Sequence, residues 1–317
     1  MLYTVTLAET TGPRDLSDQL ERGKVVFFPV CPIPLPGEAE LRFLRSELGS
    51  HLSHKNPSYH ADSDRIFGVR GSPRFQDRAR DILRDHYGHV RLFLGRVLPD
   101  FARGWRVATS SFRPLQEKGR RIRAHASSEL IHVDANAYGA TNGDRILRFF
   151  VNVHPTESRE WVSKGTFSVL FQRYAAEAGI AGFHDLRKGF WNEMYSGILR
   201  GVSAAGMRSA RLVDSSPYDR LMRRFHNWMK DSREFQESPD GLLPLRFPPY
   251  SAWMVLTDMV SHACVYGQHA FIDTFLIPLS NCRMPEHSPY HILRSGKAPD
   301  PAGDGIGRDL ARPLRSE

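Results

Sequence analysis

The first hundred residues alternate between one buried strand and amphipathic helices. Residues 23–29 (GKVVFFP) form a short apolar run that predicts a buried strand. From residue 36 onward leucines recur at helical spacing, and residues 73–101 place apolar side chains on one face opposite many arginines. We therefore expect N-terminal helices whose arginines lie on a solvated face.

The middle of the chain changes to strand-like runs that are interrupted by a helical block. Between residues 107 and 155 the runs VATSSFRPL, ELIHVDA and RILRFFVNVHP are separated by turns rich in Gly, Asn and Lys. Helical periodicity returns over about residues 161–236, where Ser216 is a candidate N-cap and Pro217 a candidate first helical residue. Strand-like runs then resume with LPLRFPPYSAWMVLTDMV and GQHAFIDTFLIPL.

This order of elements predicts an α+β protein with a barrel or jelly-roll core and N-terminal helices. We expect a single domain over residues 1–294 that contains a helical insertion at about residues 161–236. Residues 295–317 are rich in Gly, Pro and charge, and we expect them to form a flexible C-terminal tail.

Composition argues against a disulfide-rich or membrane-spanning protein and favours an anionic partner. Three cysteines at irregular spacing argue against a disulfide framework or a thiolate metal site and favour a reducing compartment. No export signal is expected in residues 1–30, and no apolar run is long enough to cross a bilayer. The net charge of +8 favours an anionic partner, which leaves nucleic acid, a phospholipid surface and an acidic small molecule as alternatives.

Candidate chemistry begins with the motif His-x-Asp. With 14 histidines and 35 acidic residues in 317 positions, chance alone predicts roughly 1.5 His-x-acid matches. The chain has two, at His60–Asp62 and His132–Asp134. The first lies in KNPSYHADSDR, a polar segment typical of a surface loop, and we do not expect it to bind metal.

The second motif lies in ELIHVDA, which predicts a strand with His132 and Asp134 on one face. On this segment alone, an interior metal site and an ordinary hydrogen-bonded pair both remain open. Further along, His262 follows an apolar strand and a polar turn, where a third ligand would complete two histidines and one carboxylate. That set is typical of non-heme iron(II) oxygenases that bind 2-oxoglutarate and oxygen on the open side of the metal.

The strand-like run RILRFFVNVHP supplies candidates for the cosubstrate site. Arg148, Phe150 and Asn152 share one face of this strand. An inward Arg148 can receive the distal carboxylate of 2-oxoglutarate through a paired contact, although a strand-end arginine that reaches solvent is the common alternative. We expect Arg145, beside the turn, to be the solvated one.

Longer blocks of the sequence resemble the bacterial 3-deoxy-D-manno-oct-2-ulosonic acid (Kdo) hydroxylases. The similar blocks are KNPSY, SFRP, HVDANAYGATNGDRILRFFVNVHP and FPPYSAWMVLTDMVSHACVYGQHAFIDTFLIP, and the resemblance spans roughly residues 20–294. It implies a double-stranded β-helix (jelly-roll, cupin-like) core and an Fe(II)/2-oxoglutarate-dependent dioxygenase. The implied reaction is hydroxylation of carbon 3 of a Kdo residue on lipid A, with 2-oxoglutarate converted to succinate.

The resemblance also implies roles for individual residues. It places the metal ligands on His132, Asp134 and His262, and it matches Arg148 and Asn152 to the strand after the turn. Two departures are visible. Residues 270–275 (AFIDTF) contain no arginine at the position where many oxygenases of this superfamily anchor the cosubstrate, and Tyr250 follows FPP where glycine would be usual.

The implied acceptor and location follow from the same resemblance. Because Kdo is a carboxylate on a phosphorylated lipid, candidate acceptor contacts are the basic or amide side chains Lys55, Asn56, Arg113 and Gln268; a surface role is an equally open interpretation of each. We expect a cytoplasmic protein that touches the anionic inner membrane peripherally, uses ascorbate as reductant in vitro and binds no nucleic acid. The sequence does not indicate an oligomeric state.

Two alternatives are kept. One is an oxygenase of the same fold that acts on a protein, a nucleic acid base or a free sugar acid. The other is a non-catalytic basic jelly-roll module that binds glycans or nucleic acid, in which the three ligand residues only form hydrogen bonds.

Overall fold

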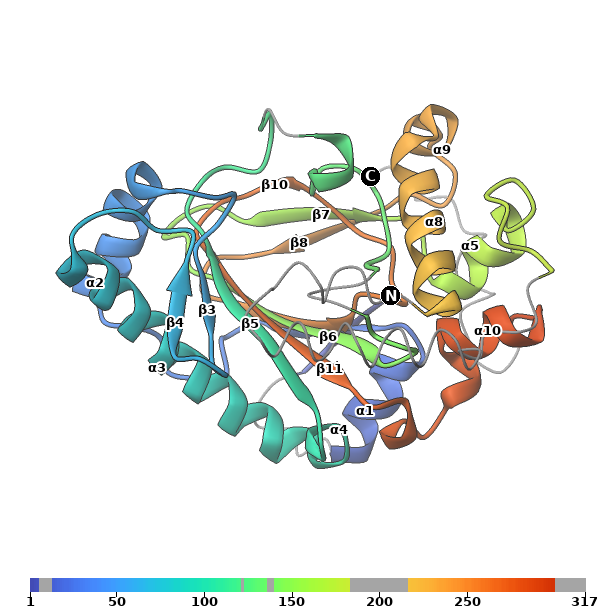
Figure 1. Cartoon of the computed structure of the whole chain (residues 1–317), viewed down its shortest axis with the longest axis horizontal. Helices are drawn as coiled ribbons and strands as arrows, with labels where there is room; N and C mark the ends of the chain where they lie inside the picture. Colours follow the sequence, from blue (N-terminus) through green and yellow to red (C-terminus); the bar gives the residue numbers. More distant parts are fainter. Residues whose placement is uncertain (6–12, 121–122, 136–139, 183–215, 300–317) are drawn as a thin grey trace, which may run out of the picture.

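The structure is a computed structural model that describes residues 1–5, 13–120, 123–135, 140–182 and 216–299. Two sheets face each other, with helices on the outer side of the larger one and at one end of the pair (Figure 1). The strands are β1 (Leu2–Thr4), β2 (Val25–Phe28), β3 (Ser58–His60), β4 (Arg65–Phe67), β5 (Arg106–Arg113), β6 (Arg145–Asn152), β7 (Arg159–Ser163), β8 (Leu243–Phe247), β9 (Ala252–Leu256), β10 (Ala263–Tyr266) and β11 (Ala270–Ile277).

The helices pack around these sheets. They are α1 (Pro13–Glu21), α2 (Glu38–Arg42), α3 (Pro73–Val97), α4 (Pro99–Ala102), α5 (Phe167–Tyr174), α8 (Pro217–Asp231), α9 (Arg233–Glu237) and α10 (Pro289–Ser295). Short π or 3-10 turns are η1 (Phe43–Glu47), η2 (Leu48–His51), η3 (Ala124–Ala126), η4 (Leu279–Asn281) and η5 (Pro285–His287). Within the described ranges, none of the helices combines the length and apolar character that a bilayer crossing requires.

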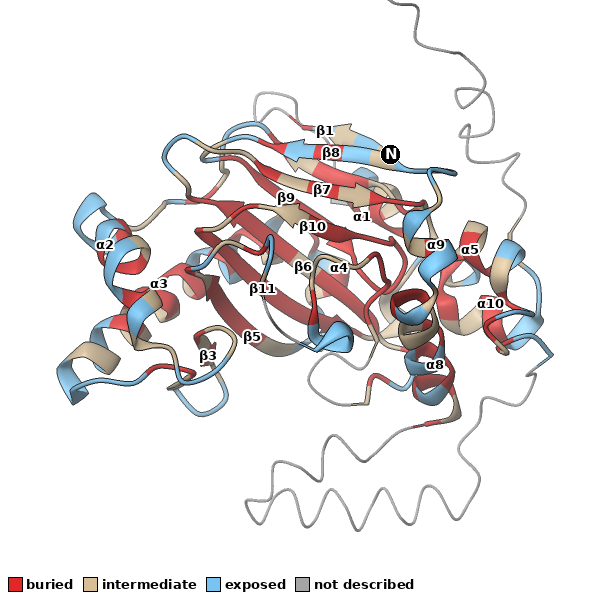
Figure 2. Cartoon of the chain, turned by 90° about the horizontal axis from the view of Figure 1, so that it is seen from above, coloured by how far each residue is buried: buried red, intermediate tan, exposed pale blue. Residues whose placement is uncertain are grey.

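The larger sheet has the order β1-β2-β9-β6-β11-β5-β3-β4, and the smaller one has the order β10-β7-β8. Side chains of β6 alternate between two layers. Phe149 lies 5.8 Å from Phe93 of α3, whereas its neighbour Phe150 lies 4.8 Å from Trp161 of the smaller sheet, both measured between ring centroids. Both faces of the larger sheet are therefore covered, and every residue of β11 is buried. Figure 2 shows this buried layer between α2 and α3 on one side and α8 on the other, with exposed residues on the outer sides of these helices.

The N-terminal elements agree with the sequence pattern. The predicted strand is β2, and the long predicted helix begins at Pro73, where the Ser72 side chain accepts a hydrogen bond from the backbone N–H of Phe75. The helix predicted over residues 73–101 divides at Leu98 into α3 and α4. Because Pro99 has no N–H to continue the helical hydrogen bonds, the chain turns there.

The prediction of a strand through ELIHVDA is wrong. His132 forms a single isolated bridge with His262, in which each backbone N–H donates to the other's carbonyl oxygen at 3.1 and 2.8 Å. Two residues later the N–H of Asp134 donates to the carbonyl oxygen of Thr257 at 2.8 Å, so the segment has already left β10. A residue pattern with period two cannot distinguish this short extended segment from a full strand.

The predicted helical insertion begins later than expected. Trp161 belongs to β7, and the helices follow it as α5, α8 and α9, while residues 183–215 of the insertion and nearly all of the predicted tail lie outside the described residues. Helix α8 starts as the sequence predicts: Ser216 and Asp219 cap each other's backbone N–H groups, and Pro217 occupies the first turn.

The prediction that Arg145 is solvated is wrong, because its side chain is fully buried. Its Nε donates to Asp258 Oδ2 at 2.6 Å, and Asp258 Oδ1 accepts the backbone N–H of Ile146. Burial raises the pKa of Asp258, and the guanidinium opposes that rise. Since Asp258 lies on the loop that leads to His262, this ion pair fixes the start of β6 to that loop.

We expect Asp258→Asn to lower the free energy of unfolding by about 3 to 5 kcal/mol, because the buried guanidinium would lose its counter-charge. Urea denaturation followed by circular dichroism measures this change. The matched control is Arg246→Gln, whose ion pair with Glu160 has side chains 74% and 46% exposed; it should change stability by no more than about 0.5 kcal/mol. Equal effects of the two substitutions would contradict the proposed role of Asp258.

Candidate metal centre

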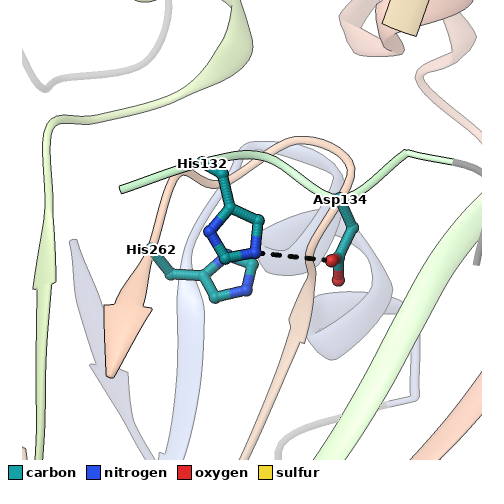
Figure 3. Close-up of side chains that lie close together, drawn as sticks. All are labelled: His132, Asp134 and His262. Carbon is teal, nitrogen blue, oxygen red and sulfur yellow. Dashed lines mark ion pairs between the residues drawn. The ribbon is translucent and has the colours of Figure 1, made fainter. Parts of the chain in front are cut away.

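His132, Asp134 and His262 converge between the two sheets (Figure 3). One potential ligand atom from each lies within 4.8 Å of the others, and all three residues are buried. Nε2 of His132 is 3.7 Å from Oδ1 of Asp134. This is the only such group of three or more metal-ligating side chains found among the described residues.

Backbone carbonyls fix the orientation of both imidazoles. Nδ1 of His132 lies 2.6 Å from the carbonyl oxygen of Leu130, and Nδ1 of His262 lies 3.0 Å from that of Val260. A carbonyl accepts only from a protonated nitrogen, so these contacts assign the hydrogen to Nδ1 and leave the Nε2 lone pair for a metal.

The electrostatics give all three ligands the protonation state that a metal needs. Burial lowers the pKa of both His132 and His262, so both are neutral at neutral pH. Burial alone would raise the pKa of Asp134, but the opposing charge of Arg148 holds that pKa well below its usual range. Two neutral imidazoles and one carboxylate, already oriented before a metal binds, fit an iron(II) ion with open coordination positions.

Two further side chains support the imidazole rings. Trp161 stacks on His262 with ring centroids 5.0 Å apart, and His226 meets the ring of His132 edge-on at 5.0 Å. His226 Nδ1 also contacts the carbonyl oxygen of Val133 at 2.7 Å, which holds the backbone between the two ligands of the motif.

Helix α8 also contributes Lys230, which sequence analysis did not single out. Its Nζ donates to the carbonyl oxygens of His125 and Ser127 at 3.0 and 2.8 Å. Burial lowers the pKa of Lys230 to about 8, and the nearby Asp134 opposes that shift. His226 and Lys230 are four residues apart, so they lie on the same face of the helix. Two polar residues at that spacing beside the apolar stripe are the sequence feature that could have indicated their role.

The other His-x-Asp motif is not part of a metal group. His60 ends β3 and packs against Phe67 with ring centroids 4.8 Å apart, while Asp62 is exposed in the following turn. The expectation that this pair does not bind metal stays a prediction.

The two candidates for the cosubstrate differ in what surrounds them. Arg148 Nη2 lies 3.0 Å from Asp134 Oδ2, and its Nε is buried without a hydrogen-bond partner. Asn152, by contrast, donates both amide hydrogens to the carbonyl oxygens of Glu157 and Phe247. Arg148 therefore faces the metal centre with a donor to offer, whereas Asn152 ties strands together and its cosubstrate role stays a prediction.

Three of the four candidate acceptor residues lie near one another: Arg113 is the charged group that acts most strongly on Lys55, and Arg120 donates to both Asn56 Oδ1 and the Lys55 carbonyl oxygen. Lys55 Nζ donates to the carbonyl oxygen of Ala126 and to Ser128 Oγ, and Asn56 Oδ1 accepts from Arg120 at 3.3 Å. Arg113 Nε lies 3.8 Å from Glu117 Oε1. Gln268 is half-buried beside Gly267. Their contacts with an acceptor stay predictions.

Comparison with known proteins decides the family. The family model described as 3-deoxy-D-manno-oct-2-ulosonic acid (Kdo) hydroxylase matches residues 5–297. The chain belongs to the Kdo hydroxylase family. This membership confirms the resemblance found in the sequence.

Solved structures agree with this family. Crystal structures of the Kdo hydroxylase KdoO, a non-heme Fe(II) α-ketoglutarate-dependent dioxygenase, match with a TM-score of 0.77 over 93% of this chain and 95% of that chain. The identity is 26% for the complex with α-ketoglutarate and Fe(III) and 27% for the apo form. A search of curated protein sequences finds no match.

Family, structural match and ligand geometry together confirm the predicted enzyme class and cofactors. The chain is an Fe(II)/2-oxoglutarate-dependent dioxygenase of the Kdo hydroxylase family. A non-catalytic module, the second alternative, is contradicted by this membership.

We expect His132→Ala and His262→Ala each to abolish stoichiometric binding of Co(II), used as an oxidation-stable substitute for Fe(II), because two remaining ligands hold a divalent ion weakly. Isothermal titration calorimetry measures this. His60→Ala is the matched control from the other motif and should bind like the parent protein. Retained circular dichroism spectra would show that the variants fold, and unchanged Co(II) binding by folded His262→Ala would refute the three-ligand site.

Proposed function

We propose that this enzyme hydroxylates carbon 3 of a Kdo residue on Kdo-lipid A, or on a related anionic glycolipid. The observation that carries this proposal is the buried group of His132, Asp134 and His262 in a chain matched over residues 5–297 by the Kdo hydroxylase family. One oxygen atom of O2 enters the acceptor as hydroxyl, and the other enters succinate as 2-oxoglutarate loses CO2.

We also propose that the two sheets form a double-stranded β-helix. The central strands of the larger sheet are β9-β6-β11-β5, and the smaller sheet is extended by the bridge between His132 and His262 next to β10. Four strand positions then face four, which is the arrangement of a jelly roll and places the ligands inside it.

Within this core, we assign iron to the three ligand side chains and the distal carboxylate of 2-oxoglutarate to Arg148. Bound iron and 2-oxoglutarate supply the oxidising power for C–H hydroxylation. Arg148 faces the interior in register with Thr274, which in turn pairs with Thr109, whose buried Oγ1 lacks a hydrogen-bond partner. The guanidinium of Arg148 and the hydroxyl of Thr109 would hold the distal carboxylate of 2-oxoglutarate in this row of residues. The cosubstrate would then lie beside the metal ligands, where it must be oriented.

The surroundings of the ligands limit water and charge at the reacting carbon. Trp161 and Phe150 pack edge to face at 4.8 Å between the sheets and close one side of the centre. On another side Lys230 presents a cation that favours the carboxylate that Kdo carries next to carbon 3. The fold therefore offers a hydrophobic wall and a cationic wall to an acidic sugar.

The location of the enzyme follows from its substrate. Iron(II) and 2-oxoglutarate are available in the cytosol, and an acceptor that is an anionic lipid places the reaction at the cytoplasmic face of the inner membrane. The net charge of +8 favours peripheral contact with that surface.

The direct test is mass spectrometry of Kdo-lipid A after incubation with the enzyme, Fe(II), ascorbate, 2-oxoglutarate and O2. We expect a gain of one oxygen that requires every component, and an acceptor dideuterated at carbon 3 should lose one deuterium in the same step. Retention of both deuterium atoms in an oxidised product would contradict attack at carbon 3. No oxidation of Kdo-lipid A, with succinate formed when a peptide or nucleic acid is supplied, would favour another acceptor.

For the cosubstrate, we expect Arg148→Gln to raise the KM for 2-oxoglutarate about 10-fold to 100-fold, because a charge-assisted contact contributes about 1.5 to 3 kcal/mol. Steady-state succinate release measures this, with Arg246→Gln as the exposed control. If the KM for 2-oxoglutarate stays constant while Co(II) affinity falls, Arg148 acts only through its ion pair with Asp134.

A further inference from the structure

A group of cations surrounds one buried carboxylate at the end of the space between the sheets. We call it the Glu117 cluster; it consists of Glu117, Lys55, Arg113, Arg120 and Arg159. Three guanidinium nitrogens lie 3.6 to 3.9 Å from the Glu117 carboxylate, which is beyond hydrogen-bond length. The Glu117 side chain is 1% exposed, and Oε1 has no hydrogen-bond partner.

The cluster carries more positive than negative charge. The charged groups that act most strongly on Lys55 are three cations, Arg113, Arg120 and Lys230, and one anion, Glu117. Burial, followed by the repulsion of Arg113, lowers the pKa of Lys55 to about 8. Arg159 is 2% exposed and its Nε has no hydrogen-bond partner. Buried cations in such excess are stabilised by a further anion.

A purely structural ion network on this chain has a different charge balance. On α3, Arg80 and Arg84 lie within 4.0 Å of Asp64, Asp77, Asp81 and Asp85, so the carboxylates in contact with these two arginines outnumber them. Among the described residues, the members of the Glu117 cluster are four bases and one acid.

One short backbone segment connects the cluster to the metal centre. Over residues 125–128, Lys230 binds the carbonyl oxygens of His125 and Ser127, while Lys55 binds the carbonyl oxygen of Ala126 and Ser128 Oγ. The carbonyl oxygen of Ser128 accepts the N–H of Cys264, two residues beyond His262 on the same extended segment. Lys230 near the metal ligands and Lys55 of the Glu117 cluster are thus joined by the same segment, residues 125–128.

Two members of the cluster are accessible enough to meet a ligand. The side chains of Arg113 and Arg120 are 13% and 14% exposed, whereas Glu117 and Arg159 lie beneath them. Arg120 is already oriented by hydrogen bonds to Asn56 Oδ1 and the carbonyl oxygen of Lys55. A preorganised arginine at the rim favours an oxyanion over a neutral sugar hydroxyl.

We propose that the Glu117 cluster binds a second oxyanion of the acceptor, a carboxylate or phosphate on the unit next to the sugar that is hydroxylated. Lys230 then faces the carboxylate of the reacting sugar, and the cluster holds the neighbouring unit. This inference rests on the proposed function for the identity of the acceptor. It makes the enzyme selective for an acceptor with at least two anionic groups.

Binding to the Co(II)-loaded protein with 2-oxoglutarate tests this without turnover. Three probes are titrated by calorimetry: a methyl glycoside of Kdo, a Kdo disaccharide without phosphate, and a single Kdo attached to a phosphorylated glucosamine. We expect Arg120→Gln to weaken binding of at least one of the two larger probes by about tenfold, which is about 1.4 kcal/mol, and to leave the methyl glycoside within about twofold. Arg120→Lys should recover part of the loss.

The pattern of loss identifies the oxyanion. A loss confined to the disaccharide identifies a carboxylate, and a loss confined to the phosphorylated probe identifies a phosphate. Equal affinities of Arg120→Gln and the parent protein for both larger probes would overturn the proposal, as would equal losses for all three. Arg246→Gln, which removes an exposed charge outside the cluster, is the matched control. If the parent protein binds none of the probes yet still converts 2-oxoglutarate to succinate, the assigned acceptor is wrong.

Discussion

The metal centre depends on one pair of backbone hydrogen bonds between His132 and His262. This bridge joins two segments that are far apart in sequence and belongs to neither strand ladder, yet it sets both ligands side by side. Each imidazole is then held at Nδ1 by a carbonyl two residues earlier, so the same backbone that pairs the segments also aims Nε2. The larger sheet supplies Arg148 beneath the site, and the smaller one supplies Trp161. A metal site preorganised in this way needs little rearrangement to bind its ion.

Much of the metal centre was predictable because it depends on the spacing of residues that are close in the sequence. His-x-Asp in an extended segment puts both side chains on one face, whether or not the segment forms a full strand, so the ligand pair was identified even though the predicted strand is wrong. The cap at Ser216 was equally local, since Ser216 and Asp219 need only their own turn. For Arg148 the sequence left an inward and a solvent-facing side chain open, and its contact with Asp134 shows the inward orientation.

The features that escaped prediction depend on tertiary partners. Arg145 follows a polar turn, and nothing near it indicates that Asp258 will neutralise it within the core. The presence of His226 and Lys230 at the metal centre depends on how α8 docks, which a helical pattern does not specify. Glu117 sits in a loop whose polar composition suggests exposure. In the structure its side chain is buried beside Arg113 of β5 and Arg159 of β7. Arg145 was assigned to solvent, and the other residues were not singled out, because in each case the position of the side chain depends on a partner that is distant in the sequence.

The positions of the charged residues therefore say more about the ligand than the net charge does. The net charge of +8 is compatible with many anionic partners. Arg80 and Arg84 of α3 are matched by aspartates and carry no information about a ligand. The cations that matter lie around the metal centre and the loop beside it: Arg148 contacts the carboxylate of Asp134, and Lys230 and Lys55 bind alternate groups of residues 125–128. Iron(II) adds two further positive charges to this interior. Since 2-oxoglutarate is a dianion and the proposed acceptor is acidic, the core is electrostatically incomplete until both bind, and charge neutralisation itself favours assembly of the reactive complex.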